Sequence, residues 1–291
     1  MDEADEPTRV LQRPLEAPER TRHAEAPAAW VAAATEIGRR HRTNQDAYSA
    51  GVTTASGAEW AALVVSDGVS SSIGAERASL TAATVVRAAL LDAVNDSSDR
   101  AETGEWDETF VRAYADAQKA VLDIARDGSP VGSCTLVAAL VTGREIHLGN
   151  IGDTRAYWIS DPVDDRPGET VQLSIDDSLA QTQIELGFTR EEAESSTHAH
   201  AITRWIGPDA PDLTPRMHHY RAEGPGLLMV CSDGLWNYAS APEAMDSLVR
   251  SLASDTDESG TALRELARDL TVWANDQGGR DNITVALARI S

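Results

Sequence analysis

Two apolar segments of this sequence end on an acid that is followed at once by glycine. "ALVVSDG" ends with Asp67 and its glycine, and "LLMVCSDG" ends with Asp233 and its glycine in the other half of the chain. Asp-Gly alone is a common turn signal, and a third copy at Asp127 follows a helical pattern, where glycine ends the helix. Two strands that each deliver a carboxylate at their end predict a site built from acids.

Two further acids stand where a polar turn enters an apolar strand. Asp46 lies in "RTNQDAYSA" and Asp281 lies in "GGRDNITVAL". If the strands bring all four acids to one edge, their like charges raise one another's pKa and resist ionising together. Divalent cations such as Mg²⁺ and Mn²⁺ resolve that conflict, because they prefer carboxylate, carbonyl and water oxygens. The sequence offers no cluster of His or Cys for zinc.

Composition excludes several classes of partner and catalyst. Lys and Arg number 25 against 47 Asp and Glu, a formal net charge of −22, which phosphate backbones and anionic membranes repel. The longest apolar stretches are far shorter than the ~20 residues of a membrane helix, and "MDEADEPTRV" is no signal peptide. Cys134 and Cys231 lie in strand patterns without a basic loop after them, which argues against a cysteine nucleophile. We expect a cytoplasmic protein that binds neither nucleic acid nor membrane.

The elements that must position the acids alternate between blocks of strands and pairs of helices. Strands are expected at 29–37, 46–53 and 60–66, three times within 133–160, at 168–174, 215–221, 226–232 and 281–290. Helices are expected at about 74–93, 105–126, 241–254 and 260–277. Because the joined strands look like meanders, the pattern predicts an α+β fold with two antiparallel sheets packed face to face and flanked by helices.

The chain reads as one domain with an arm. Residues 1–27 are rich in Glu, Arg, Pro and Ala without apolar periodicity, so we expect a disordered or loosely packed N-terminal arm. Residues 28–291 show no internal linker and form the single folded domain. Within it, 177–200 changes to a helical period interrupted at Gly187 and predicts a flap beside the acids.

Eight segments of this chain closely resemble, in order, the bacterial branch of the protein phosphatase 2C (PPM-type) family of metal-dependent Ser/Thr phosphatases. They are "NQDAY", "VVSDGVSSS", "SCTLVAALV", "LGNIGDTRAYWI", "LSIDDSLAQ", "ITRWIG", "CSDGLW" and "GRDNITV", spread over about 29–290. The resemblance implies an α-β-β-α sandwich with a centre of two Mn²⁺ or Mg²⁺ ions at one end of the sheets. It assigns the metal set to Asp67 as the bridging ligand, the Gly68 carbonyl, Asp233, Asp281, and Asp46, which orders metal-bound water in catalysis. Asn282 would support Asp281.

The phosphate-binding and proton-donating groups depart from the family pattern. Members usually carry a phosphate-binding arginine shortly before the "NQD" acid, and "GRRHRTNQD" offers Arg39, Arg40 and Arg42. We expect Arg40 to serve in phosphate binding and catalysis, with Arg42 as a second phosphate ligand. Val69 stands after the first Asp-Gly where many members carry His or Met, so no side chain there can act as general acid.

A third metal, common in bacterial members, would need another acid. Asp127 precedes the "SCT" strand, and Asp176 and Asp177 in "SIDDS" are further candidates. Asp153 in "NIGDTR" sits in a hairpin turn, where we expect it to anchor Arg155 instead of binding metal.

The resemblance implies an enzyme that hydrolyses phosphoSer and phosphoThr in other proteins by attack of a water between two metals. Its partners would be phosphoproteins and the Ser/Thr kinase that makes them, and the chain would act as a monomer. An alternative is a non-catalytic, pseudophosphatase-type regulator that binds a phosphoprotein or kinase. The intact acids argue against it, whereas Val69 and the shifted arginines keep it open. A two-metal nuclease conflicts with the net charge.

Overall fold

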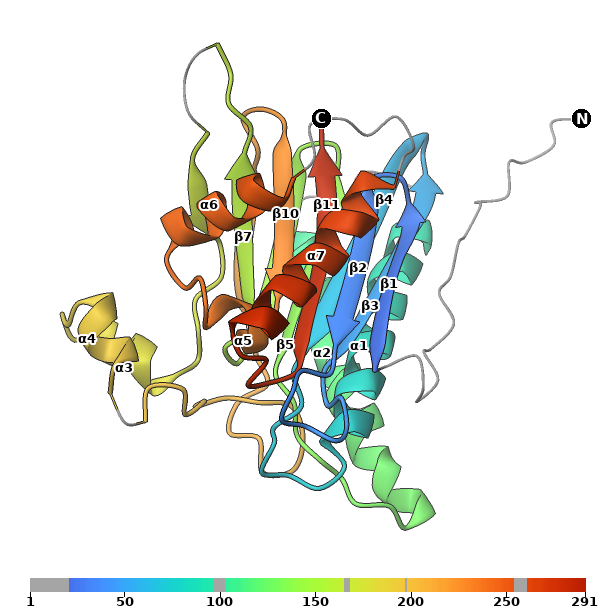
Figure 1. Ribbon diagram of the computed structural model, residues 1–291. Helices are drawn as coiled ribbons and strands as arrows, with labels where there is room; N and C mark the ends of the chain where they lie inside the picture. Colours follow the sequence, from blue (N-terminus) through green and yellow to red (C-terminus); the bar gives the residue numbers. More distant parts are fainter. Residues whose placement is uncertain (1–20, 97–102, 165–167, 197, 254–260) are drawn as a thin grey trace, which may run out of the picture.

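The computed structural model describes residues 21–96, 103–164, 168–196, 198–253 and 261–291, and its strands form two antiparallel sheets packed face to face (Figure 1). The six-stranded sheet has the spatial order β1 (Arg22–Ala28), β2 (Val31–Glu36), β11 (Ile283–Ile290), β10 (Gly226–Cys231), β7 (Arg155–Ser160) and β8 (Thr170–Gln172). The five-stranded sheet has the order β3 (Ala47–Ala55), β4 (Ala58–Ser66), β5 (Leu136–Thr142), β6 (Glu145–Ile151) and β9 (Arg216–Arg221).

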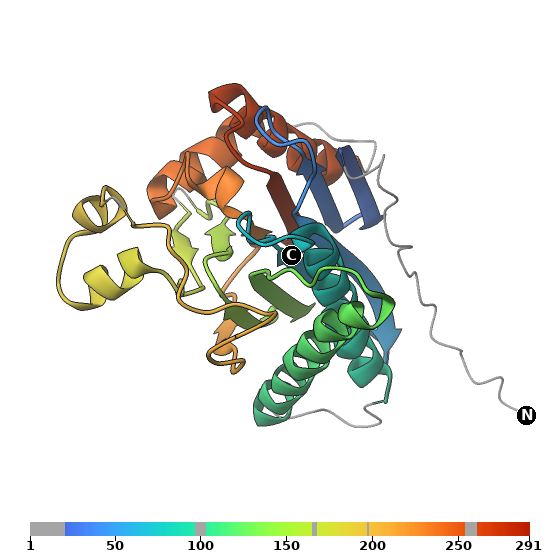
Figure 2. The ribbon, with the colours of Figure 1, turned by 90° about the horizontal axis from the view of Figure 1, so that it is seen from below.

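Helices cover the outer face of each sheet (Figure 2). The described helices are α1 (Ala75–Asp96), α2 (Thr103–Asp123), α3 (Leu179–Glu185), α4 (Arg190–Glu194), α5 (Asp233–Trp236), α6 (Pro242–Leu252) and α7 (Ala262–Gln277), with a 3-10 turn at Ile124–Asp127. Helices α1 and α2 pack on the five-stranded sheet, and α6 and α7 pack on the six-stranded sheet. The predicted α+β sandwich is confirmed. None of the described helices is both long and apolar enough to cross a membrane.

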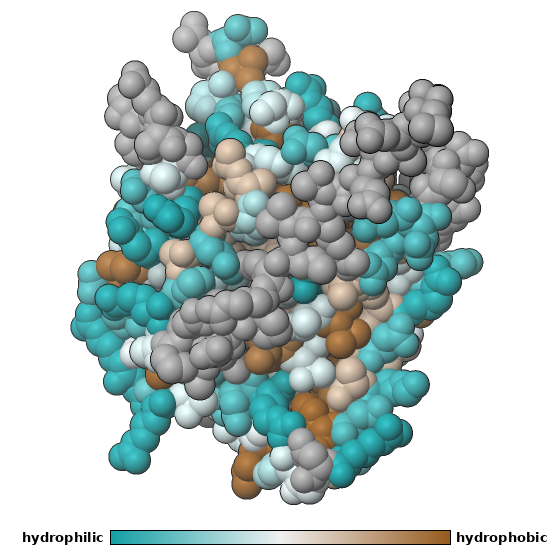
Figure 3. Space-filling view, turned by 90° about the vertical axis from the view of Figure 1, so that its right-hand side faces the viewer, coloured by the Kyte–Doolittle hydropathy of each residue, from teal (hydrophilic) through white to brown (hydrophobic). Residues whose placement is uncertain are grey.

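Alternation along the strands explains why the sequence shows long apolar runs. On β4, Ala62 and Val64 pack against α1 and α2, whereas Leu63 and Val65 pack against the other sheet. Because both faces of the strand are buried from residue 61 onwards, positions 61–65 are all apolar. Most charged side chains lie at the surface, and hydrophilic residues cover much of the face shown in Figure 3.

The predicted N-terminal arm is wrong for residues 22–27, which belong to β1; residues 1–20 lie outside the described part of the chain. β1 pairs with β2 at the edge of the six-stranded sheet, with Arg22 opposite Glu36. An edge strand with few buried side chains has no strong apolar pattern, so its composition resembles that of a loose arm. The Arg22 guanidinium forms an ion pair with the buried Glu36 carboxylate.

We predict that a chain starting at residue 29 is less stable than one starting at Thr21. It loses the β1 ladder and leaves Glu36 buried without its arginine, which costs at least about 1 kcal/mol and lowers the melting temperature by about 2–4 °C per kcal/mol. Thermal unfolding of the two chains measures the difference. Arg22→Ala in the longer chain separates the ion pair from the strand, and equal melting temperatures for both chains would contradict the role of β1.

Candidate metal centre

The four acids singled out in the sequence come from the same end of both sheets. Asp67 directly follows β4 and Asp46 directly precedes β3, its antiparallel neighbour. Asp233 lies two residues after β10, and Asp281 lies two residues before β11, the antiparallel neighbour of β10. The charges of the other three acids all add to the effect of burial in raising the pKa of Asp67. The structure therefore gathers residues that are up to 235 positions apart in the sequence.

Close backbone contact at Gly68 brings the first two acids together. Thr135 N–H donates to the Asp67 carbonyl (2.8 Å) and Val69 N–H donates to the Ser133 carbonyl (2.8 Å). In this antiparallel pattern the Gly68 carbonyl points away from the neighbouring strand. A Cβ on Gly68 would lie 2.6 Å from the Gln45 carbonyl oxygen. Only glycine therefore allows the "NQD" turn to pack here.

A second glycine contact joins the other two acids. A Cβ on Gly234 would lie 1.9 Å from the carbonyl oxygen of Asn282. The single helical turn α5, which the sequence analysis missed, begins at Asp233 and presses against the start of β11. Asn282 donates its N–H to Asp281 Oδ1 (2.8 Å) and accepts a hydrogen bond on Oδ1 from Gln45 N–H (2.7 Å). Asn282 thus links Asp281 to the turn that carries Asp46.

Hydrogen bonds from the six-stranded sheet orient the Asp46 carboxylate. Ser232 Oγ donates to Asp46 Oδ2 (2.7 Å) and accepts from Thr284 N–H (3.0 Å). Ser232 immediately precedes Asp233. One serine therefore sets the relative position of acids from both sheets.

Burial raises the pKa of three acids in this group, Asp46, Asp233 and Asp67. Loss of solvent raises the pKa of Asp46 from 3.8 to about 7, opposed by the Ser232 hydrogen bond and increased by the charge of Asp281. Burial, followed by the charge of Asp281, raises the pKa of Asp233 to about 6. The pKa of Asp67 lies well above its usual value because of burial and then the charges of Asp46 and Asp233. Asp67 and Asp233 still keep part of their side chains open to solvent, as a site that admits a ligand requires.

The donor set fits hard divalent cations. Asp233 Oδ2 accepts from Asn237 Nδ2 (3.0 Å), whereas Asp233 Oδ1 is buried without a hydrogen-bond donor among the described residues, and the carboxyl group of Asp67 lies beside it. The carboxylates are neighbours without forming a closed cage, since in the described chain no three His, Cys, Asp or Glu side chains converge as a ready metal site. Mg²⁺ uses one or two carboxylates and keeps several waters, so an open group of acids suits it.

Asp153 belongs to this group, contrary to the sequence interpretation. Its buried side chain has a pKa well above the usual value because of burial and then the charge of Asp233, and its own charge acts on Asp67. The Asp153 carbonyl accepts a hydrogen bond from Trp236 Nε1 (2.9 Å), which ties its turn to α5. Arg155 instead pairs with Asp176. Asp153 lies two residues after the end of β6, so it is also a strand-end acid, but it lacks the glycine that follows Asp67 and Asp233.

Two of the acids considered for a third metal, Asp176 and Asp177, form ion pairs with arginines instead. Asp176 accepts from both Arg155 Nε (3.0 Å) and Nη2 (2.7 Å). Asp177 accepts from Arg216 Nε (2.7 Å) and forms an ion pair with Arg204 (3.4 Å). Both carboxylates are buried and occupied by guanidinium groups, so they anchor loops. The Asp127 side chain lies outside the described part of the structure.

The basic loop before Asp46 places one side chain against the acids. His41 Nε2 lies 3.2 Å from Asp281 Oδ1. Arg39 pairs with Asp276 (2.7 Å) on the far side of the loop. Arg40 and Arg42 are exposed and form no ion pair with a described acid, so the structure does not test their predicted contact with phosphate.

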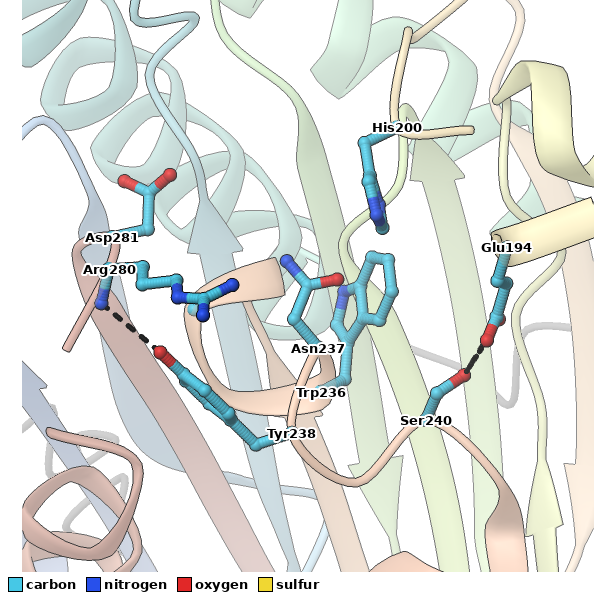
Figure 4. Close-up of a pocket in the computed structure, with 9 residues that line it drawn as sticks. Glu194, His200, Trp236, Asn237, Tyr238, Ser240, Arg280 and Asp281 are labelled. Carbon is cyan, nitrogen blue, oxygen red and sulfur yellow. Dashed lines mark hydrogen bonds between the residues drawn. The ribbon is translucent and has the colours of Figure 1, made fainter. Parts of the chain in front are cut away.

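A cleft of about 350 Å³ opens beside the acids (Figure 4). Asp281 and Gly234 contribute one side of it, and Glu194 and His200 of the flap (177–200) contribute the other. The segment after α5 lies between them. The acids and the flap therefore share one opening.

Comparison with known proteins shows the family. The sequence profile described as "Protein phosphatase 2C" matches residues 36–271. The chain belongs to the protein phosphatase 2C family. It is 28% identical to protein phosphatase PhpP of Streptococcus pneumoniae over 260 residues, which cover 88% of this chain and 96% of PhpP. It is 33% identical to serine/threonine protein phosphatase PstP of Mycobacterium tuberculosis over 185 residues, 63% of this chain and 32% of PstP.

This protein phosphatase 2C family chain thus spans about a third of the length of the mycobacterial relatives it matches. It also shares its fold with the crystal structure of the PstP catalytic domain in complex with two manganese ions. The TM-score is 0.64 at 23% identity, over 90% of this chain and 98% of that one.

We predict that the metal-free protein becomes more stable as pH falls from 8 to 6. Because the folded-state pKa values of Asp46 (about 7) and Asp233 (about 6) exceed 3.8, the native state binds more protons than the unfolded chain in this range. Stability present below the raised pKa values is lost as pH rises through them, on the order of 1–3 kcal/mol. Urea unfolding of chelator-treated protein at both pH values measures it.

The matched variants for this pH test are Asp233→Asn, which should shrink the difference, and Asp269→Asn at a partly exposed position of α7, which should not. Added Mn²⁺ should raise the melting temperature more at pH 8 than at pH 6, since the cation competes with protons for the same carboxylates. A pH-independent stability between 6 and 8 would contradict a cluster of raised carboxyl pKa values.

Proposed function

We propose that this chain is a metal-dependent protein Ser/Thr phosphatase. The observation that supports this most is that strand-end acids from both sheets lie at one end of the sandwich, where burial and then the neighbouring acids raise the pKa of Asp67 and where Asp233 Oδ1 has no hydrogen-bond partner among the described residues. Membership of the protein phosphatase 2C family supplies the reaction class.

Asp67 and the Gly68 carbonyl would hold two cations, Mn²⁺ or Mg²⁺, with Asp233 and Asp281 as further ligands. When bound, such cations lower the pKa of a water and neutralise the phosphoryl oxygens. Asp46, held by Ser232, would orient the attacking water by accepting its hydrogen bond. The manganese complex of the PstP catalytic domain supports the choice of metal.

Arg40, assisted by Arg42, would bind the phosphate oxygens from the loop before Asp46. Its exposed guanidinium pairs with no described acid, so it can turn towards a bound phosphate. If a third cation binds, Asp153 supplies its carboxylate, because Asp153 is the remaining buried acid beside Asp233 and Asp67.

The substrates would be phosphorylated Ser and Thr in other proteins, and the partner enzyme would be the kinase that produces them. A non-catalytic regulator with the same fold is the second candidate. Val69, which cannot donate a proton, and the arginine loop favour it, whereas the complete set of acids disfavours it.

Asp67→Asn and Asp233→Asn should each lower the hydrolysis of p-nitrophenyl phosphate at saturating Mn²⁺ by about 100-fold or more, because each removes a ligand charge from the metals. Both variants should stay folded, since loss of one charge relieves repulsion in the cluster. Asp269→Asn serves as the control. Near wild-type turnover by either variant would exclude the two-metal mechanism, and an inactive wild-type protein that still binds phosphoprotein would support the regulator.

The flap should matter for protein substrates more than for small ones. It projects beside the sandwich in both ribbon views, with Leu186 (75% exposed) and Phe188 (53%) between α3 and α4 (Figures 1 and 2). We expect that replacing 181–195 by a Gly-Ser linker lowers kcat/KM for a phosphopeptide much more than for p-nitrophenyl phosphate, because only the longer substrate is oriented by the flap. Equal losses on both substrates would show that the segment builds the metal site itself.

A further inference from the structure

The cleft beside the acids contains one strongly basic side chain, Arg280. Among the described lining residues it is the one arginine or lysine. Its guanidinium extends across the cleft towards Asn237 and away from the Asp281 carboxylate (Figure 4). The Arg280 main-chain N–H donates to Tyr238 Oη (3.2 Å), which fixes the start of the side chain.

The acid on the opposite wall does not compete for this guanidinium. Glu194 accepts hydrogen bonds from Ser240 Oγ (2.7 Å), Arg190 Nη1 (3.0 Å) and Arg155 Nη2 (3.2 Å). Three donors, two of them cations, therefore already neutralise Glu194. Arg280 is exposed and forms no ion pair with a described acidic side chain.

An unpaired arginine in a polar cleft is a site for an anion. The chain carries a net charge of −22, so most of its surface repels anionic ligands. The guanidinium of Arg280 gives the cleft a local positive charge that can attract an anion. The volume of about 350 Å³ lies at the lower end of the ~300–1,000 Å³ typical of ligand pockets and exceeds what one phosphate fills. It suits the side chain of a bound polypeptide.

The position of the cleft says which part of a substrate would enter it. Arg280 directly precedes Asp281, and the cleft runs from Asp281 to the flap. When a phosphorylated residue lies at the acids, the residues next to it in the substrate pass over this cleft.

We propose that Arg280 recognises an anionic side chain beside the phosphorylated residue of a protein substrate. The inference rests on the proposed phosphatase function and adds a sequence preference to it. The anion is a carboxylate or a second phosphate, both of which a guanidinium binds with two parallel hydrogen bonds. Substrates phosphorylated within acidic sequences are then preferred over neutral ones.

The test compares phosphopeptides that share one phosphoThr and differ at one neighbouring position, which carries Asp, phosphoSer, Gln or Lys. Each position on either side is varied in turn. For the wild-type protein with Mn²⁺, kcat/KM should be about tenfold higher with Asp than with Gln at the position that reaches Arg280, as expected for one charge-assisted pair. The phosphoSer peptides show whether a second phosphate substitutes for the carboxylate.

Variants assign the preference to Arg280. In Arg280→Gln the ratio of kcat/KM between the Asp and Gln peptides should fall to about one, mainly through KM, and in Arg280→Glu the Lys peptide should become the better substrate. Arg268→Gln, an exposed arginine on α7 paired with Asp269, is the matched control and should keep the wild-type ratio. Using ratios within each variant cancels any loss common to all substrates.

Two results would overturn the inference: a wild-type protein that hydrolyses all the peptides without preference, or an Arg280→Gln variant that keeps the preference. Neither would affect the proposed phosphatase function. That function fails separately, if the wild-type protein hydrolyses none of the peptides and no p-nitrophenyl phosphate.

Discussion

The structure depends on holding several carboxyl groups, buried or partly buried, next to one another against their mutual repulsion. Asp46, Asp67, Asp153 and Asp233 all have raised pKa values because burial and neighbouring charge act in the same direction. Such a group persists only if the surrounding fold is rigid enough to prevent its members from separating. The two sheets provide that rigidity, because each acid lies within two residues of a strand that packs against helices on one face and against the other sheet on the other face.

Close backbone approach, more than side-chain bonding, sets the spacing of the acids. Gly68 lies against the Gln45 carbonyl, and Gly234 lies against the Asn282 carbonyl, at distances that a Cβ would forbid. Ser232 and Asn282 then add the hydrogen bonds that link one sheet to the other. Replacing either glycine would push the strand ends apart and change the whole group at once.

A buried arginine connects the group of strand-end acids with the flap. Arg155 bonds to Asp176, reaches Glu194 at the end of α4, and stacks its guanidinium on the Trp236 ring at 3.6 Å. Trp236 in turn holds the Asp153 carbonyl. A buried ion pair of this kind adds little net stability, but it selects one arrangement of the parts it joins. The flap position and the turn that carries Asp153 are therefore coupled through one side chain.

Local sequence patterns predicted the sandwich, most of its strands, its helix pairs and four of the strand-end acids. They could do so because strand and helix periodicity and apolar burial depend on residues that are near one another in the sequence. Local patterns did not predict β1, because its exposed edge position leaves no apolar signal in the sequence. They also did not predict that Asp153 lies beside Asp67 and Asp233, because that depends on neighbours from other strands. The choice of partners was also invisible: Arg155 takes Asp176, His41 approaches Asp281, and Arg280 faces the cleft. These contacts join residues from distant parts of the chain, and only the packing of the two sheets determines which strand ends meet.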